Sequence, residues 1–248
     1  MTADMPIIRR FAHRTNNCKF VVDKIFRRAS KIQKEKSCFV IMGVTCVTQW
    51  PVTDNRTVPQ AVEVLTKRLD AFGATKTGNF GVDCETYQSV PTNVPPKYIH
   101  VMHNKEQPYT CYAVTDNRTC LVCENSFEAI MHRLNGFYVP KKTARIESKG
   151  TRYEMGDFIV KIGIVSLGPH ARGVLVEVEY TPCVMIQDCW PLMVEFMQGF
   201  MGAQYTPSQP PTLIAKPEVP FSAEDTVFQY LEQFETFVRR GSSTATVR

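Results

Sequence analysis

Two pairs of carboxylates are the residues of this chain whose types and spacing could do chemistry. Glu177-x-Glu179 and Asp83-x-Glu85 would each present two acids on one face of a strand, because side chains two residues apart in a strand point the same way. Facing one another inside a barrel, these four groups could hold a divalent cation. A triphosphate would also need several bases, and the Glu177 face offers only Lys161 among apolar and glycine neighbours. We therefore keep a metal-dependent hydrolase as the alternative and predict no enzyme.

Cysteine and histidine spacing gives no stronger site. Cys120-x-x-Cys123 has no second pair, and residues three apart in a strand point to opposite faces, so these thiols read as buried small side chains rather than a zinc site. His100 and His103 have the same spacing, and His132 lies beside the apolar stripe of a short helix, so packing or surface roles are favoured. No P-loop, Rossmann glycine string, G-x-S-x-G or H-E-x-x-H occurs. The sequence predicts no catalytic, cofactor or metal site.

One long β-hairpin between Gly150 and Trp190 is the clearest structural pattern. Both of its strands alternate and carry one wholly apolar face. For those faces to lie on one side, residues of equal parity must pair, for instance Ile164 with Val178, across a loop with an odd number of residues. That register puts Lys161 diagonal to Glu179, so the second face carries compensated charge.

The remaining elements favour an α+β fold. Capping residues and apolar stripes predict four helices, beginning near Thr57, Asn125, Asp188 and Ser222. Alternation predicts eight strands, at about 43–48, 80–87, 97–103, 109–115, 119–123, 144–153, 157–167 and 173–181. Eight strands with inserted helices favour a mainly antiparallel eight-stranded β-barrel, closed or nearly closed, over a βαβ sheet.

Basic residues are concentrated at the start of the chain. Residues 1–41 hold ten Lys and Arg against three acids, whereas residues 42–248 hold 19 against 21. The basic leader could be an amphipathic helix, a transit peptide or a localisation signal, but we interpret it as a solvated extension upstream of the usual start. The near-neutral remainder lacks the electrostatic footprint of a nucleic-acid-binding domain. Nine scattered cysteines indicate reduced thiols in an intracellular compartment.

An ordered series of short motifs resembles the Mediator complex subunit 20 family, also called TRF-proximal protein. The series comprises Met42-Gly43-Val44-Thr45-Cys46-Val47, Val82-Asp83-Cys84-Glu85-Thr86-Tyr87, Val101-Met102-His103-Asn104, Gly150-Thr151-Arg152-Tyr153, Val176-Glu177-Val178-Glu179-Tyr180 and Asp188-Cys189-Trp190. Each motif alone is weak, but their order from Met42 to near Arg240 is specific. The resemblance covers the whole predicted domain.

The resemblance implies a nuclear, non-enzymatic role in RNA polymerase II transcription. Family members form a barrel that pairs with the related barrel of Mediator subunit 18, joined to a helix of subunit 8, within the head module. That barrel is related to the tunnel-type triphosphatases, whose metal site the four carboxylates would resemble. No cofactor, membrane or sequence-specific nucleic acid is implied.

Domain boundaries follow from composition and the family-like start. We expect a basic extension at 1–41, a β-barrel domain at 42–205, a Pro-rich linker at 206–221, an amphipathic helix at 222–240 and a tail at 241–248. The apolar side of the last helix is broader than one docking stripe requires. We therefore predict that it contacts the partner through Phe228, Leu231, Phe234 and Val238.

Overall fold

The computed structural model describes residues 43–52, 55–90, 95–141, 145–202, 205, 207–214 and 218–243. The predicted basic extension lies outside the described residues, as do residues 244–248 of the predicted tail.

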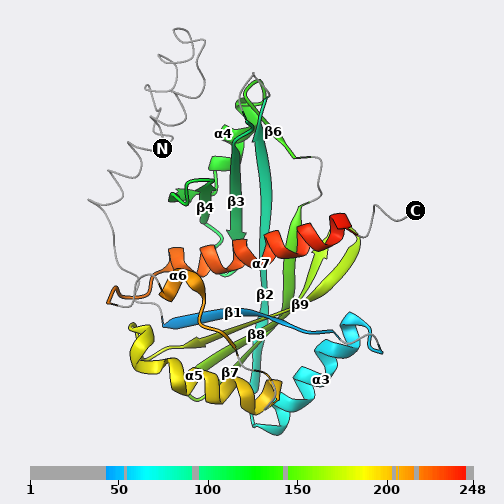
Figure 1. The fold of residues 1–248 in the computed structure, drawn as a ribbon, viewed down its shortest axis with the longest axis vertical. Coiled ribbons are helices and arrows are strands. Elements are labelled where there is room, and N and C mark those ends of the chain that lie inside the picture. Colours follow the sequence, from blue (N-terminus) through cyan, green and yellow to red (C-terminus); the bar gives the residue numbers. More distant parts are fainter. Residues whose placement is uncertain are drawn as a thin grey trace.

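One antiparallel sheet forms the body of the protein (Figure 1). Its strand order is β1-β9-β8-β7-β2-β3-β4-β5, and β6 pairs separately with β2. The strands are β1 (Val44–Trp50), β2 (Thr75–Ser89), β3 (Tyr98–Asn104), β4 (Thr110–Thr115), β5 (Cys120–Glu124), β6 (Tyr138–Pro140), β7 (Ile146–Met155), β8 (Phe158–Leu167) and β9 (His170–Tyr180). The predicted antiparallel architecture is confirmed. Within the described residues no pairing joins β1 to β5, so the sheet keeps two edges instead of closing.

Two strands differ from the sequence prediction. The strand β2 begins at Thr75, earlier than predicted, and crosses nearly the full length of the molecule in Figure 1. Its first residues are polar and exposed, so they lack the apolar alternation that marks a strand. The three-residue strand β6 was not predicted, because so short a segment shows no periodicity.

The β8–β9 hairpin keeps the predicted parity but not the predicted register. Ile164 pairs with Val174, whereas the prediction paired it with Val178. The turn is tighter than expected, because Leu167 already pairs with His170 and only two residues lie between them. An irregularity in the ladder just before the turn then restores equal parity. Apolar alternation therefore fixes which faces meet, but not how far one strand slides along the other.

Alternation along the strands divides the core between two faces. Even-numbered residues of β8 and β9, such as Ile162 and Val176, pack against α3 (Val58–Ala71) and α5 (Ile186–Met201). Odd-numbered residues, such as Leu175, pack against α7 (Ala223–Ser243). We call the α7 side the inner face and the opposite side the outer face.

At the other end of the sheet, α4 (Phe127–Arg133) covers the outer face of β2 to β5. Its buried Phe127 and Met131 pack on Val101 and Ala113. A short helix, α6 (Pro211–Ile214), lies within the predicted Pro-rich linker. Figure 1 accordingly shows α3 and α5 at one end of the molecule and α4 at the other, with α7 running across the middle. None of the helices in the described ranges is long and apolar enough to cross a membrane.

Two of the predicted helix starts are confirmed by their capping contacts. Thr57 and Gln60 form a reciprocal capping box at the start of α3. At the start of α7, the Ser222 backbone N–H and hydroxyl both donate to the Asp225 carboxylate. By contrast, Asp188 does not cap α5, because the helix already begins at Ile186 and Asp188 sits in its first turn.

The start of α4 also differs from the prediction. Its N-cap is Ser126 rather than Asn125, without a side-chain capping bond.

Candidate functional site

A buried ion pair lies on the inner face at the centre of the sheet. Lys161 of β8 stands directly opposite Glu177 of β9, not diagonal to Glu179 as the predicted register had it. The Lys161 Nζ donates to Glu177 Oε1 at 3.0 Å. Both residues are nearly sealed from solvent, at 6% and 5% exposure. A charge so deeply buried is stable only when paired, so each side chain depends on the other.

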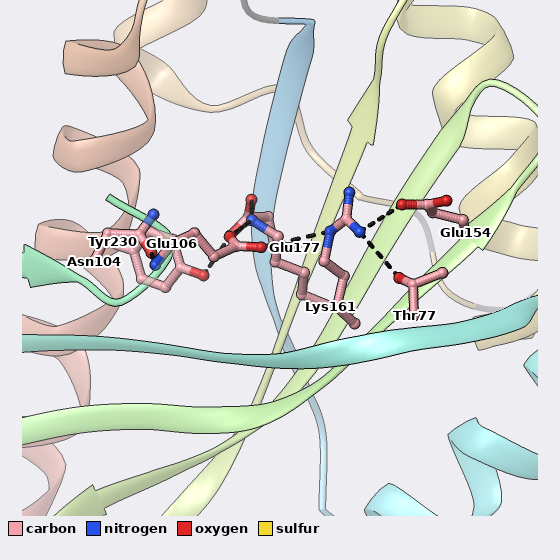
Figure 2. Close-up of polar contacts among 8 residues, drawn as sticks. Thr77, Asn104, Glu106, Glu154, Lys161, Glu177 and Tyr230 are labelled. Atoms are coloured by element: carbon pink, nitrogen blue, oxygen red, sulfur yellow. Dashed lines mark hydrogen bonds and ion pairs between the residues drawn. The ribbon is translucent and has the colours of Figure 1, made fainter. Parts of the chain in front are cut away.

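Side chains from a loop and from two further strands extend this pair into a network. Glu106, in the loop between β3 and β4, accepts from Lys161 Nζ at 2.5 Å and lies 3.4 Å from Arg152 Nε of β7. Arg152 also donates to Thr77 at 3.0 Å and pairs with Glu154. Figure 2 shows these groups in one line across the inner face. The line alternates in charge, so every buried charge has an opposite neighbour.

The helix α7 completes the network through a tyrosine. The Tyr230 hydroxyl donates to Glu177 Oε2 at 2.5 Å, and the tyrosine is 3% exposed. Burial, with the adjacent Glu177 carboxylate, raises the pKa of Tyr230 well above its ordinary value. The phenol therefore keeps its proton and serves as a donor. Glu177 thus uses one oxygen for Lys161 and the other for α7.

Burial and charge oppose each other at Lys161. Burial alone lowers the pKa of the Lys161 ammonium, but the carboxylates of Glu177 and Glu106 outweigh it and raise that pKa above the ordinary value. The lysine therefore remains charged at neutral pH. Burial, with the nearby Glu177, raises the pKa of Glu179, which accepts from the Gly43 backbone N–H at 3.2 Å.

The four predicted metal-binding carboxylates do not meet. Glu177 and Glu179 lie on the inner face, whereas Asp83 and Glu85 lie on the outer face of β2, since the intervening Cys84 packs against α7. Glu85 accepts from the Tyr87 hydroxyl at 2.8 Å on that outer side. The sheet itself separates the two pairs, so the predicted alternative site is not formed. Among the described residues, no group of three or more His, Cys, Asp or Glu is arranged to hold a metal ion.

The predicted partner-binding side chains lie on the side of α7 that faces the protein's own sheet. Phe228, Leu231 and Phe234 are 8%, 9% and 1% exposed, and Val238 packs at the margin of the same cluster. That cluster contains residues from each of the eight long strands. The helix therefore covers the inner face of the sheet. The contribution of these four residues to partner binding stays a prediction.

Glutamines of α7 contact the β1 edge, which sequence reasoning missed. Gln229 Oε1 accepts from the Val47 backbone N–H at 2.8 Å, and its Nε2 donates to the Thr45 carbonyl oxygen at 2.9 Å. Gln233 reaches the Val47 carbonyl oxygen at 3.5 Å. A side-chain amide carries the same donor and acceptor as a peptide group, so Gln229 stands in for a neighbouring strand. Its sequence signal was faint, a polar residue inside the apolar side of a helix.

One cavity of about 260 Å³ lies beside the C-terminal half of α7. Its walls mix apolar side chains with His100, Lys141 and Glu235. It does not include Glu177 or Glu179, so the acids of the network do not open into it.

A family model and curated relatives identify the same family over most of the described residues. Residues 42–235 match the family model described as TATA-binding related factor (TRF) of subunit 20 of Mediator complex. The chicken Mediator of RNA polymerase II transcription subunit 20 is 48% identical over 197 residues, which cover 78% of this chain and 93% of the relative. The human protein of the same name is 44% identical over 198 residues, with the same coverage. The chain belongs to the Mediator subunit 20 family.

Solved structures resemble this family member only distantly. The PH1012 protein of Pyrococcus horikoshii is 12% identical with a TM-score of 0.40, covering 64% of this chain and 91% of that chain. An RNA triphosphatase of S. pombe is 10% identical with a TM-score of 0.27, covering 66% and 71%.

In this member of the Mediator subunit 20 family, the structure locates the short motifs on which the resemblance rests. Val44 to Val47 form the β1 edge that α7 contacts, and Glu177 is the acid at the centre of the network. The Val82-to-Tyr87 motif instead supplies the outer-face acids of β2. Two of these motifs thus contact α7, through Thr45 and Val47 of β1 and through Glu177 of β9.

Proposed function

We propose that this protein is a non-enzymatic structural subunit of the Mediator coactivator complex in the nucleus, and that it pairs directly with Mediator subunit 18 in the head module. Membership of the Mediator subunit 20 family supports the first part. The direct partner, the link to subunit 8 and indirect contact with RNA polymerase II come from the family resemblance.

One observation carries the non-enzymatic part of the proposal: α7 occupies the inner face. Tyr230 binds the central acid Glu177, Gln229 binds the β1 backbone, and Phe234 is buried among the strands. Lys161 and Glu177 form an ion pair, so their charges neutralise each other. A substrate phosphate on this face would have to displace the helix and break these bonds together.

Partner binding is tested by co-expression. Tagged full chain should co-purify with untagged Mediator subunit 18 in equal amounts, and the pair should be more soluble than the chain alone. An apolar cluster on the β6 end, with Val90, Phe137 and Val139 all about 40% exposed or more, is the place for a surface substitution. Phe137→Asp should reduce co-purification without unfolding the chain if the partner covers that end. Failure of the unaltered chain to co-purify would overturn the pairing.

The predicted contact between α7 and the partner has to be separated from the role of α7 in the fold. Because Phe228 and Leu231 are buried in the protein's own core, Phe228→Asp with Leu231→Asp should unfold the chain as well as reduce co-purification. Far-ultraviolet circular dichroism separates the two effects. Lys161→Ala is unsuitable as a control, since Lys161 is buried in the network. A folded double variant that loses subunit 18 would support direct contact by α7; a folded variant that keeps subunit 18 would confine α7 to the fold.

The enzyme alternative is tested by hydrolysis. The purified chain should release no phosphate from a nucleoside triphosphate with manganese, and Glu177→Gln with Glu179→Gln should change nothing in that assay. Manganese-dependent release that disappears in the double variant would refute the structural role.

A further inference from the structure

Four chemically active side chains form one row across the outer face. Asp83 of β2 pairs with His103 of β3, His103 pairs with Cys111 of β4, and Cys111 pairs with Cys123 of β5. Directly opposite residues on antiparallel strands have Cβ atoms about 4.5–5.5 Å apart, so each side chain touches the next. The two thiols therefore lie side by side although eleven residues separate them in sequence.

The two thiols differ in exposure and share a hydrogen bond. Cys111 is fully buried, whereas Cys123 is partly exposed on β5, the last strand of the described sheet. Each thiol also has a backbone acceptor, the Glu124 carbonyl oxygen at 3.3 Å from Cys111 Sγ and the Leu121 carbonyl oxygen at 3.7 Å from Cys123 Sγ. The hydrogen bond between the two thiols, together with the neighbouring His103, lowers the pKa of Cys111 below its ordinary value. The same bond raises the pKa of Cys123. Of the two thiols, Cys111 therefore ionises more readily.

Charged groups hold the histidine in its protonated form. The His103 Nδ1 lies 3.6 Å from the Asp83 carboxylate, and its Nε2 lies 3.8 Å from Glu128 of α4. Hydrogen bonding to Asp83 raises the pKa of His103 to about 9. Arg145 also donates to Asp83, at 2.6 Å, and its Nη2 lies 3.5 Å from His103 Nδ1, so the carboxylates of Asp83 and Glu128 face two cations. A positive imidazole therefore stands beside Cys111 at neutral pH and favours the thiolate.

Backbone geometry allows the two sulfurs to bond. The Asn125 N–H donates to the Tyr109 carbonyl oxygen at one end of the β4–β5 ladder, so Cys111 and Cys123, two residues inward, occupy a hydrogen-bonded position of the same type. Such pairs have Cα atoms about 5.5 Å apart, inside the range that disulfides accept. Their Cβ atoms are farther apart than a relaxed disulfide prefers, so the bond would be strained and easily reduced.

We propose that Cys111 and Cys123 are a reversible oxidation site that forms a cross-strand disulfide with hydrogen peroxide. The partly exposed Cys123 sulfur attacks one peroxide oxygen, the O–O bond breaks, and hydroxide leaves as water with the Cys123 proton, which gives a sulfenic acid at Cys123. The Cys111 thiolate then attacks the Cys123 sulfur, the S–O bond breaks, and hydroxide leaves and takes from solvent the proton that Cys111 had released, which gives water. The two sulfurs supply two electrons to peroxide, and the net products are one disulfide and two waters.

Tryptic peptide mapping of the full chain tests this directly, in complex with subunit 18 if that keeps it soluble. Arg118 separates the thiols, so Cys111 falls in peptide 106–118, whereas Cys120 and Cys123 share peptide 119–133. After peroxide and alkylation, the two peptides should be joined, and dithiothreitol should release them. The link should persist in Cys120→Ser, whose thiol lies on the inner face, and vanish in Cys123→Ser.

The role of His103 has its own measurement. His103→Gln should slow disulfide formation about tenfold at neutral pH and approach the unaltered rate at alkaline pH, because the thiolate then forms without the imidazole. A His103→Gln rate equal to the unaltered one at neutral pH would contradict that role. No linked peptide in the unaltered folded chain, or a link that requires Cys120, would overturn the proposal.

Discussion

Replacing Gln229 by Met tests how strongly α7 secures the edge of the sheet. The substitution keeps the length of the side chain but removes its amide. It leaves the Val47 N–H and the Thr45 carbonyl oxygen without their partner, and both residues are buried, at 2% and 0% exposure. Each unsatisfied buried group costs about 1–3 kcal/mol, so Gln229→Met should lower the free energy of unfolding by about 2–6 kcal/mol. Burial of the thioether offsets a small part of this loss.

Two assays follow the change. Urea unfolding gives the loss of stability, and amide hydrogen exchange of Val47 reports the broken bond itself. Gln233→Met is the control, since its bond to the Val47 carbonyl oxygen is longer, at 3.5 Å, and its other bond, accepted from the Gln49 amide at 2.8 Å, is only partly buried. The reasoning is refuted if Gln229→Met costs no more than the control and the Val47 amide stays equally protected.

Three further outcomes follow from the same structure. Lys161→Met should lower the free energy of unfolding by about 3–5 kcal/mol in urea, against under about 1 kcal/mol for Lys149→Met, whose ion pair is half exposed; equal losses would contradict the buried network. Burial raises the pKa of Glu179, so the folded state binds its proton more tightly and stability falls as pH rises through that window. Glu179→Gln should therefore raise the urea midpoint at neutral pH but not at pH values below the carboxyl range, and a uniform shift would argue against this. Gly150→Ala should lower the thermal midpoint, because a Cβ there would meet a carbonyl oxygen of the next strand at 1.8 Å, whereas Gly78→Ala, in open space, should not.

Much of the fold was predictable, because its signals are local. The Thr57 capping box and the Ser222–Asp225 contact depend on residues three apart, and both helices begin where these predict. The hairpin faces follow from alternation. Its register does not, because the ladder irregularity near the turn has no periodic signature.

The candidate site was less predictable, because it is built from distant residues. Glu106 reaches Lys161 from a loop, and Tyr230 reaches Glu177 from the far end of the chain. Alternation along the strand correctly predicts that the two acids of each pair lie on one face. It does not predict that Glu177 and Asp83 lie on opposite faces of one sheet. The Cys-x-x-Cys spacing likewise gave no sign that Cys123 lies opposite Cys111 of the neighbouring strand.

Purification of Mediator from cells that express the tagged full chain tests the central claim most directly. If the protein is a structural subunit of the complex, the tag should recover the head-module subunits in near-equal amounts with the chain, including subunit 18. Recovery of the folded chain alone, with Mediator absent from the eluate, would contradict it.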